Sequence, residues 1–189
     1  MNTQKRTIKD TFSSIFSSSK GFTLLELLVV VVIIAILAAI ALPQYNKAVL
    51  KSQLHTGIPI VESLYRAQQI YAIANGDFAT DIDDLDVEIP KNSSCEKQQN
   101  TSYSRYICDF GTIGLADSFS NVQYKTPSNN ILYSHDLVDH DDIHKGGDHW
   151  CFAKGSKTAN EVCIDLGGKP QGTIYAYTNT KHWNHYLLD

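Results

Sequence analysis

The sequence lacks the short motifs that accompany common catalytic and cofactor-binding sites. No GxSxG, HExxH or phosphate-binding glycine loop occurs in its 189 residues. Its four cysteines show no CxxC or paired Cys/His finger spacing, which disfavours a structural zinc finger. These absences argue against an enzyme, and we predict no catalytic residues and no cofactor.

Basic residues are scarce beyond the N-terminus. Residues 1–21 carry four basic side chains and one acidic side chain, Asp10, a net charge of +3. The remaining residues carry 12 basic and 19 acidic side chains, a net charge of −7, so the whole chain has a net charge of −4. The acidic remainder disfavours a general nucleic-acid-binding surface, because such surfaces need clustered Lys and Arg. A basic start before apolar residues predicts that the N-terminus stays in the cytoplasm and that the membrane follows.

Polar side chains are absent between Leu27 and Leu42. As a helix, residues 22–42 would be about 31 Å long, which is enough to cross the hydrocarbon core of a bilayer. The apolar core of a cleavable signal peptide is shorter, about 7–15 residues. We therefore predict one membrane-spanning helix.

One carboxylate, Glu26, stands immediately before this apolar run. A charge within the membrane costs about 1–3 kcal/mol unless it reaches the interface or finds a partner, so an ordinary anchor leaves Glu26 unexplained. If the chain were cut between Gly21 and Phe22, the new amine of Phe22 would lie one helical turn from Glu26. The carboxylate could then pair with that amine or with the amine of a neighbouring chain, which supplies alignment more surely than net stability.

The segment KGFTLLELLVVVVIIAILAAIALPQYNKAV, residues 20–49, closely resembles the N-terminus of type IV pilins and of the pseudopilins of type II secretion. In that family a prepilin peptidase cuts after the glycine, here Gly21, and methylates the new N-terminal residue, here Phe22. The family's glutamate, here Glu26, is taken to recruit and align subunits. Pro43 falls at the family's helix-kinking proline, and filaments of the family imply a locally unwound stretch before it, here at residues 35–42.

The resemblance implies a structural subunit of a type IV pilus, active in adhesion, motility or DNA uptake. Its parts would be a leader at residues 1–21, a transmembrane and filament-core helix at 22–47, and a globular head at 48–189. Implied partners are copies of itself and other pilins, the prepilin peptidase, the pilus assembly machinery and the inner membrane. The chain would be a single-pass inner-membrane protein before assembly and then part of an extracellular pilus or a periplasmic pseudopilus.

Two alternatives remain at this stage. A pseudopilin of type II secretion would have the same N-terminus, but disulfides suit a subunit exposed outside the cell and favour the pilin. An anchored periplasmic metal-binding protein would use the histidine-rich region and leave Glu26 without a role.

The sequence beyond Pro43 predicts an amphipathic helix and then a small antiparallel sheet, an α+β pilin fold. Asn75-Gly76 predicts the end of the helix, whereas Gly57 and Pro59 predict further kinks. Four or five short strands are predicted between residues 105 and 179. Apolar residues recur at steps of three and four, at Leu50, Leu54, Ile58, Val61, Leu64 or Tyr65, and Tyr71.

All four cysteines follow the apolar run, which predicts two disulfides in an oxidising compartment. Of three connectivities we favour the sequential one, Cys95–Cys108 and Cys151–Cys163, which closes two short loops. The regions 77–104 and 151–163 are predicted to be loops. By resemblance, such edges lie on the filament surface.

Histidine and aspartate crowd into SHDLVDHDDIHKGGDHW, residues 134–150. Zinc or nickel could find ligands among His135, His140, His144 and His149, and the aspartates could favour calcium. We instead predict a solvated polar loop whose histidines change charge near pH 6.5, with no metal site. His182 and His185, which flank Trp183, are predicted to lie on an edge strand or at the surface.

Overall fold

A computed structural model describes residues 21–89, 94–99, 104–116, 121–139, 144–175 and 182–189. The chain divides into two units, residues 1–42 and 43–189. The predicted leader up to residue 20, His140 and the end of the last predicted strand, residues 176–179, lie outside the described residues.

The first element is a long helix, α1 (Leu24–Asn75). It ends as predicted, because Gly76 takes φ 84° and donates its N–H to the carbonyl of Ala72. The helix is continuous through Pro43 and Pro59. Residues 35–42 are helical in this single chain, so the unwound stretch implied by filaments is absent here, and the kink at Pro43 stays a prediction.

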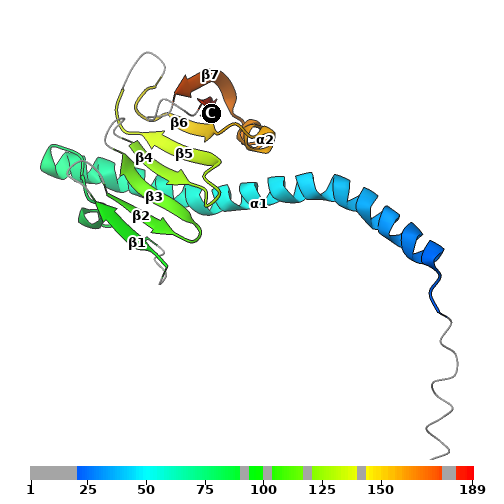
Figure 1. The fold of residues 1–189 in the computed structure, drawn as a ribbon. Coiled ribbons are helices and arrows are strands. Elements are labelled where there is room, and N and C mark those ends of the chain that lie inside the picture. The colour runs from blue at the N-terminus through cyan, green and yellow to red at the C-terminus, as the bar shows by residue number, and fades with distance from the viewer. Residues whose placement is uncertain (1–20, 90–93, 100–103, 117–120, 140–143, 176–181) are drawn as a thin grey trace, which may run out of the picture. The chain divides into compact units, whose positions relative to one another are not determined.

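The predicted combination of a long helix and an antiparallel sheet is confirmed, but the described residues form a sheet of eight strands and not of four or five (Figure 1). The strand order is β1-β2-β3-β4-β5-β6-β8-β7 and every neighbouring pair is antiparallel. The strands are β1 (Glu96–Gln99), β2 (Ser104–Cys108), β3 (Gly111–Ala116), β4 (Asn121–Lys125), β5 (Ile131–Asp136), β6 (His149–Ala153), β7 (Lys169–Tyr175) and β8 (His182–Leu188).

Three features account for the miscount. The polar strand β1 has no buried position and therefore no alternation to detect. The stretch RYICDFGTIGL looks like one strand but turns at Asp109-Phe110 into the β2–β3 hairpin. The C-terminal β8 pairs with β6 on one side and β7 on the other, so the prediction of an edge strand was wrong. Trp183 and His185 on β8 are buried.

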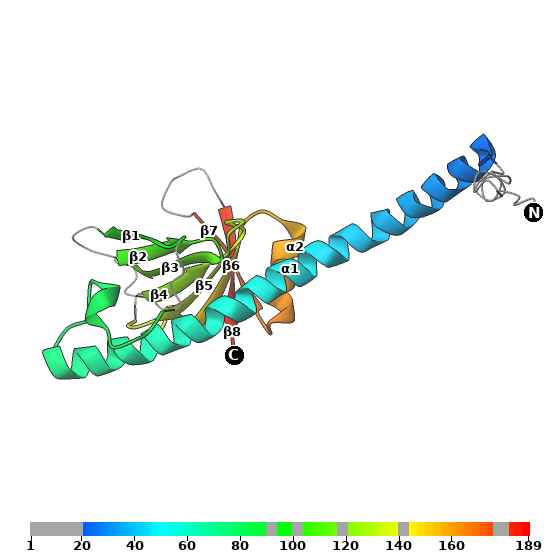
Figure 2. The ribbon, with the colours of Figure 1, turned by 90° about the horizontal axis from the view of Figure 1, so that it is seen from below.

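The second half of α1 and a short helix, α2 (Lys157–Asp165), lie over the same face of the sheet (Figure 2). The predicted apolar stripe contributes Leu50, Leu54, Val61 and Leu64 to the core, whereas Ile58, Tyr65 and Tyr71 are only partly buried. Gly57 is also buried because the ring of Tyr124 occupies the space where a β-carbon would lie.

The prediction of a loop at residues 151–163 was wrong, because this region contains the end of β6 and most of α2. Ser156 caps α2 by accepting from the N–H of Ala159. The disulfides Cys95–Cys108 and Cys151–Cys163 are present in the predicted sequential pairing. The first joins the residue before β1 to β2, and the second joins β6 to α2.

Candidate assembly segment

The start of α1 contains a reciprocal capping arrangement that joins Thr23 and Glu26. The Glu26 carboxylate accepts from the Thr23 N–H at 2.9 Å and from the Thr23 hydroxyl at 2.8 Å. In return the Glu26 N–H donates to the Thr23 hydroxyl oxygen at 3.2 Å. This is a capping box, and it satisfies backbone donors that have no partner within the helix.

Glu26 therefore has a role within its own chain that the sequence interpretation missed. The signal was available, because a Thr three residues before a Glu at the start of an apolar run is the sequence form of this cap. Both bonds from Thr23 go to Oε2 of Glu26. The cap orients the carboxylate at the first turn and leaves Oε1 outside these two bonds.

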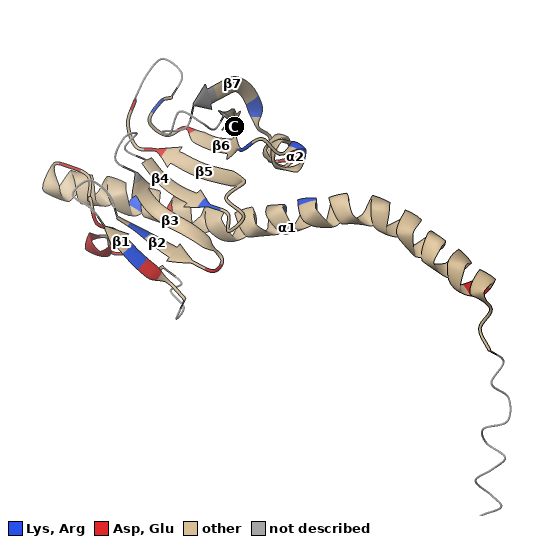
Figure 3. Cartoon of the chain, viewed as in Figure 1, with Lys and Arg blue, Asp and Glu red and all other residues tan. Residues whose placement is uncertain are grey.

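The apolar side chains of residues 22–42 are largely exposed among the described residues of the first unit. Phe22 is 75% exposed and Ile40 is 68% exposed. The helix α1 is long and apolar enough to cross a membrane, and none of the residues in its most apolar part is buried. Between Glu26 and Lys47 it carries no charged side chain, the long tan stretch of α1 in Figure 3.

Gly21 and Phe22, the predicted cleavage site, lie just before α1 and are exposed. An exposed, non-helical segment is what a peptidase requires of its substrate backbone. The predicted cleavage-site residues and the cap residues thus lie within six consecutive positions, Gly21 to Glu26.

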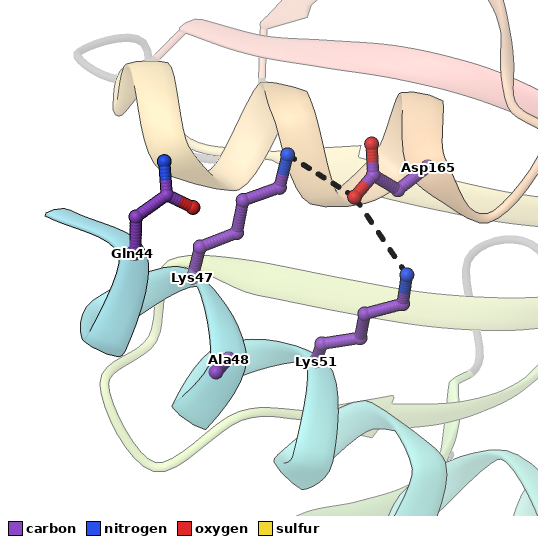
Figure 4. A pocket seen from close by; sticks show the side chains of 5 residues that line it. All are labelled: Gln44, Lys47, Ala48, Lys51 and Asp165. Carbon is purple, nitrogen blue, oxygen red and sulfur yellow. Dashed lines mark ion pairs between the residues drawn. The ribbon is translucent and has the colours of Figure 1, made fainter. Parts of the chain in front are cut away.

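At the start of the second unit, Lys47 and Lys51 of α1 face Asp165 of α2 (Figure 4). Their Nζ atoms lie 3.1 Å and 3.6 Å from Asp165 Oδ2. A hydrogen bond from Lys47, helped by the charges of Lys47 and Lys51, lowers the pKa of Asp165 below its usual value. Gln44 and Ala48 complete the rim of this small open hollow, which holds no constellation of catalytic groups.

The prediction of a solvated loop is wrong for the two ends of the histidine-rich region, which lie in strands, and residues 140–143 lie outside the described residues. His135 and Asp136 lie buried in β5, and His149 lies in β6. The pKa of His135 is lowered to about 4, well below the predicted 6.5. Burial is the largest cause, and the charge of the neighbouring His149 is the second. Burial raises the pKa of Asp136 to about 7.

The long helix on an antiparallel sheet and the capped apolar N-terminal segment define a pilin-like α+β protein. Residues 16–42 match the family model described as the prokaryotic N-terminal methylation motif. The predicted resemblance of residues 20–49 to the N-terminus of type IV pilins is confirmed.

Curated relatives show the same resemblance over a short segment. The chain is 50% identical over 48 residues to a type IV major fimbrial protein FimA of Dichelobacter nodosus, and equally so to a fimbrial protein of the same organism. The match covers 25% of this chain and 30% of each relative. The chain thus spans under a third of these relatives by alignment, and no solved structure matches it.

Proposed function

We propose that this protein is the structural subunit of a type IV pilus, cut after Gly21 and methylated at Phe22, and polymerised through α1. The observation that carries the proposal is the apolar stretch of residues 22–42, which is exposed in the single chain and begins with the capped Glu26. The match of this stretch to the methylation motif supports the same processing.

Before assembly, the bilayer would cover the apolar residues of the first unit. In a filament, the same residues of neighbouring copies would cover one another, and small side chains such as Ala38 and Ala39 would permit close packing. The Phe22 amine of an incoming subunit would pair with Glu26 of a subunit already in place. This pairing sets axial register, because an apolar bundle offers the amine few other partners.

The first experiment is the non-reduced intact mass of the protein in filaments sheared from cells that make it. We expect a chain that begins at methylated Phe22 and is lighter by four hydrogens for its two disulfides. A processed chain confined to the membrane fraction would instead favour a pseudopilin or a scarce minor subunit. An uncut chain in the membrane would overturn the proposal.

A second experiment separates the two roles of Glu26. Glu26→Gln retains an acceptor for the Thr23 donors, since Gln also serves in capping boxes, but removes the charge. We expect this variant to be inserted and cut but absent from filaments. Thr23→Ala is the converse control, because it removes the side-chain half of the cap and keeps the charge. Filaments of normal yield from Glu26→Gln would show that Glu26 acts as a cap alone.

A further inference from the structure

Three side chains with metal-ligating atoms meet between α1 and the β5–β6 hairpin. Glu62 comes from α1, His135 from β5 and His149 from β6, and their ligand atoms all lie within 4.8 Å of one another. His135 and His149 are directly opposite each other in the β5–β6 register. Opposite residues have Cβ atoms about 4.5–5.5 Å apart, so strand pairing alone brings the two imidazoles together beneath the helix.

The distances in this cluster are too long for good hydrogen bonds and fit donors around a shared ion. Glu62 Oε1 lies 3.4 Å from His135 Nδ1 and 3.3 Å from His149 Nε2. Hydrogen bonds between N–H and O span about 2.7–3.2 Å. A tetrahedral zinc ion with ligands at about 2.0–2.1 Å separates its donor atoms by about 3.3–3.4 Å.

The buried nitrogen of His135 is an independent observation. Its side chain is 6% exposed, and Nδ1 has no hydrogen-bond partner among the described residues. A buried polar atom without a hydrogen-bond partner is costly, so native structures rarely leave one unsatisfied. The ring is held in place by Tyr65, which stacks on it with centroids 3.4 Å apart.

The carboxylate is also held in place from outside the cluster. The Tyr133 hydroxyl donates to Glu62 Oε1 at 2.8 Å. Metal-ligating carboxylates are commonly oriented by such hydrogen bonds. His149, by contrast, has a side chain that is 33% exposed and gives an ion access from solvent. A rigid buried ligand, an oriented carboxylate and an open side are the parts of a built site.

We propose that Glu62, His135 and His149 bind one Zn²⁺ ion, with a fourth position open to water or to a donor from another molecule. Two imidazoles and one carboxylate suit zinc and related transition metals, whereas calcium and magnesium prefer oxygen ligands alone. The ion ties α1 to two strands of the sheet. Because it binds the folded head, it stabilises that head.

The test uses the full-length chain, purified in detergent and stripped with a chelator, with Zn²⁺ and Co²⁺ as probes. We expect one Zn²⁺ per chain, a visible spectrum of tetrahedral Co²⁺, and a melting temperature that rises with added Zn²⁺. Glu62→Gln and His149→Ala should each weaken Zn²⁺ binding about 100-fold or more, beyond the loss typical of outer-shell changes. Tyr133→Phe should weaken it by about 10–100-fold.

The matched control is His55→Ala, because His55 is an exposed histidine on the same helix. This variant should bind zinc as the wild type does, which separates the site from adsorption at surface histidines. Circular dichroism of the stripped variants checks that each is folded. Wild-type protein without stoichiometric Zn²⁺ or Co²⁺ binding would overturn the proposal, as would equal affinity in wild type, Glu62→Gln and His149→Ala.

Discussion

The two halves of α1 have similar apolar side chains but opposite surroundings. In the first half Ile36 and Leu37 are 58% and 61% exposed, whereas in the second half Leu54 and Leu64 are fully buried. Burial stabilises by about 25 cal/mol for each Å² of apolar surface removed from water, whichever surface provides the cover. The second half therefore finds its cover within the head, whereas the described residues provide no such cover for the first half.

The pattern of polarity differs in the same way. Lys47, Lys51 and Glu62 interrupt the second half and leave a single apolar stripe, as expected for a helix on the surface of a core. Between Leu27 and Leu42 the helix is apolar on all sides, which is typical of a helix surrounded by lipid or by other helices. One continuous helix thus serves two environments.

The largest expected effect on stability comes from truncating one leucine in each half of α1. Leu64→Ala should destabilise the head by about 2–5 kcal/mol, because it removes a fully buried side chain. Leu37→Ala should change head stability by less than about 0.5 kcal/mol, because its side chain contacts no core. Chemical denaturation of the full chain in detergent, followed by near-UV circular dichroism, measures both. Equal losses would mean that the head and the first half unfold together.

The disulfides allow a second comparison, since their loops are nearly equal at 13 and 12 residues of separation. Chain entropy predicts about 3 kcal/mol of stabilisation from each. Cys151 and Cys163 are fully buried, so Cys151→Ala with Cys163→Ala should cost more than that in denaturant unfolding. Cys95→Ala with Cys108→Ala removes a bridge beside the exposed edge strand β1 and should cost less. Equal costs would indicate that loop entropy sets both values, and the reverse order would contradict the argument from burial.

A third prediction concerns Gly57, where helix propensity and packing oppose each other. An alanine usually stabilises a helix by about 1 kcal/mol relative to glycine. At Gly57, however, an added Cβ would overlap the fully buried ring of Tyr124. Gly57→Ala should therefore destabilise the head by about 1–3 kcal/mol in thermal unfolding. A stabilised Gly57→Ala would contradict the packing argument.

The long helix was predictable from sequence because its signals are local. The apolar run, the stripe beginning at Leu50 and the stop at Gly76 each depend on residues close in the chain. The prediction for residues 20–49 depended on one contiguous motif. The capping box at Thr23 was equally local, and it was missed because Glu26 was considered only as a membrane charge.

The His/Glu cluster was only partly within reach of the sequence. His135 and His149 were named among possible zinc ligands, but their meeting with Glu62 was not predicted. Glu62 and His135 are 73 positions apart, and only the β5–β6 register and the placement of α1 bring them together. The strand β5 also ends inside a stretch so rich in Asp and His that composition favoured a loop. Polar residues that are buried by tertiary contacts carry no local signal of burial, as Gln68 shows by exchanging two amide hydrogen bonds with Ala79.

The smallest expected effect concerns how α2 is held against the second half of α1. The ion pairs of Lys47 and Lys51 with Asp165 lie at the surface, where such pairs contribute little. Because the folded-state pKa of Asp165 is lowered, its stabilisation is present above the ordinary value of 3.8 and disappears as the pH falls through the lowered pKa. Asp165→Asn should thus lower the melting temperature slightly at pH 7 and not at all in strong acid.

Glu88→Gln, at an exposed carboxylate without an ion pair among the described residues, should show no such difference between the two pH values. A deficit for Asp165→Asn that persists in acid would assign the effect to packing and not to charge.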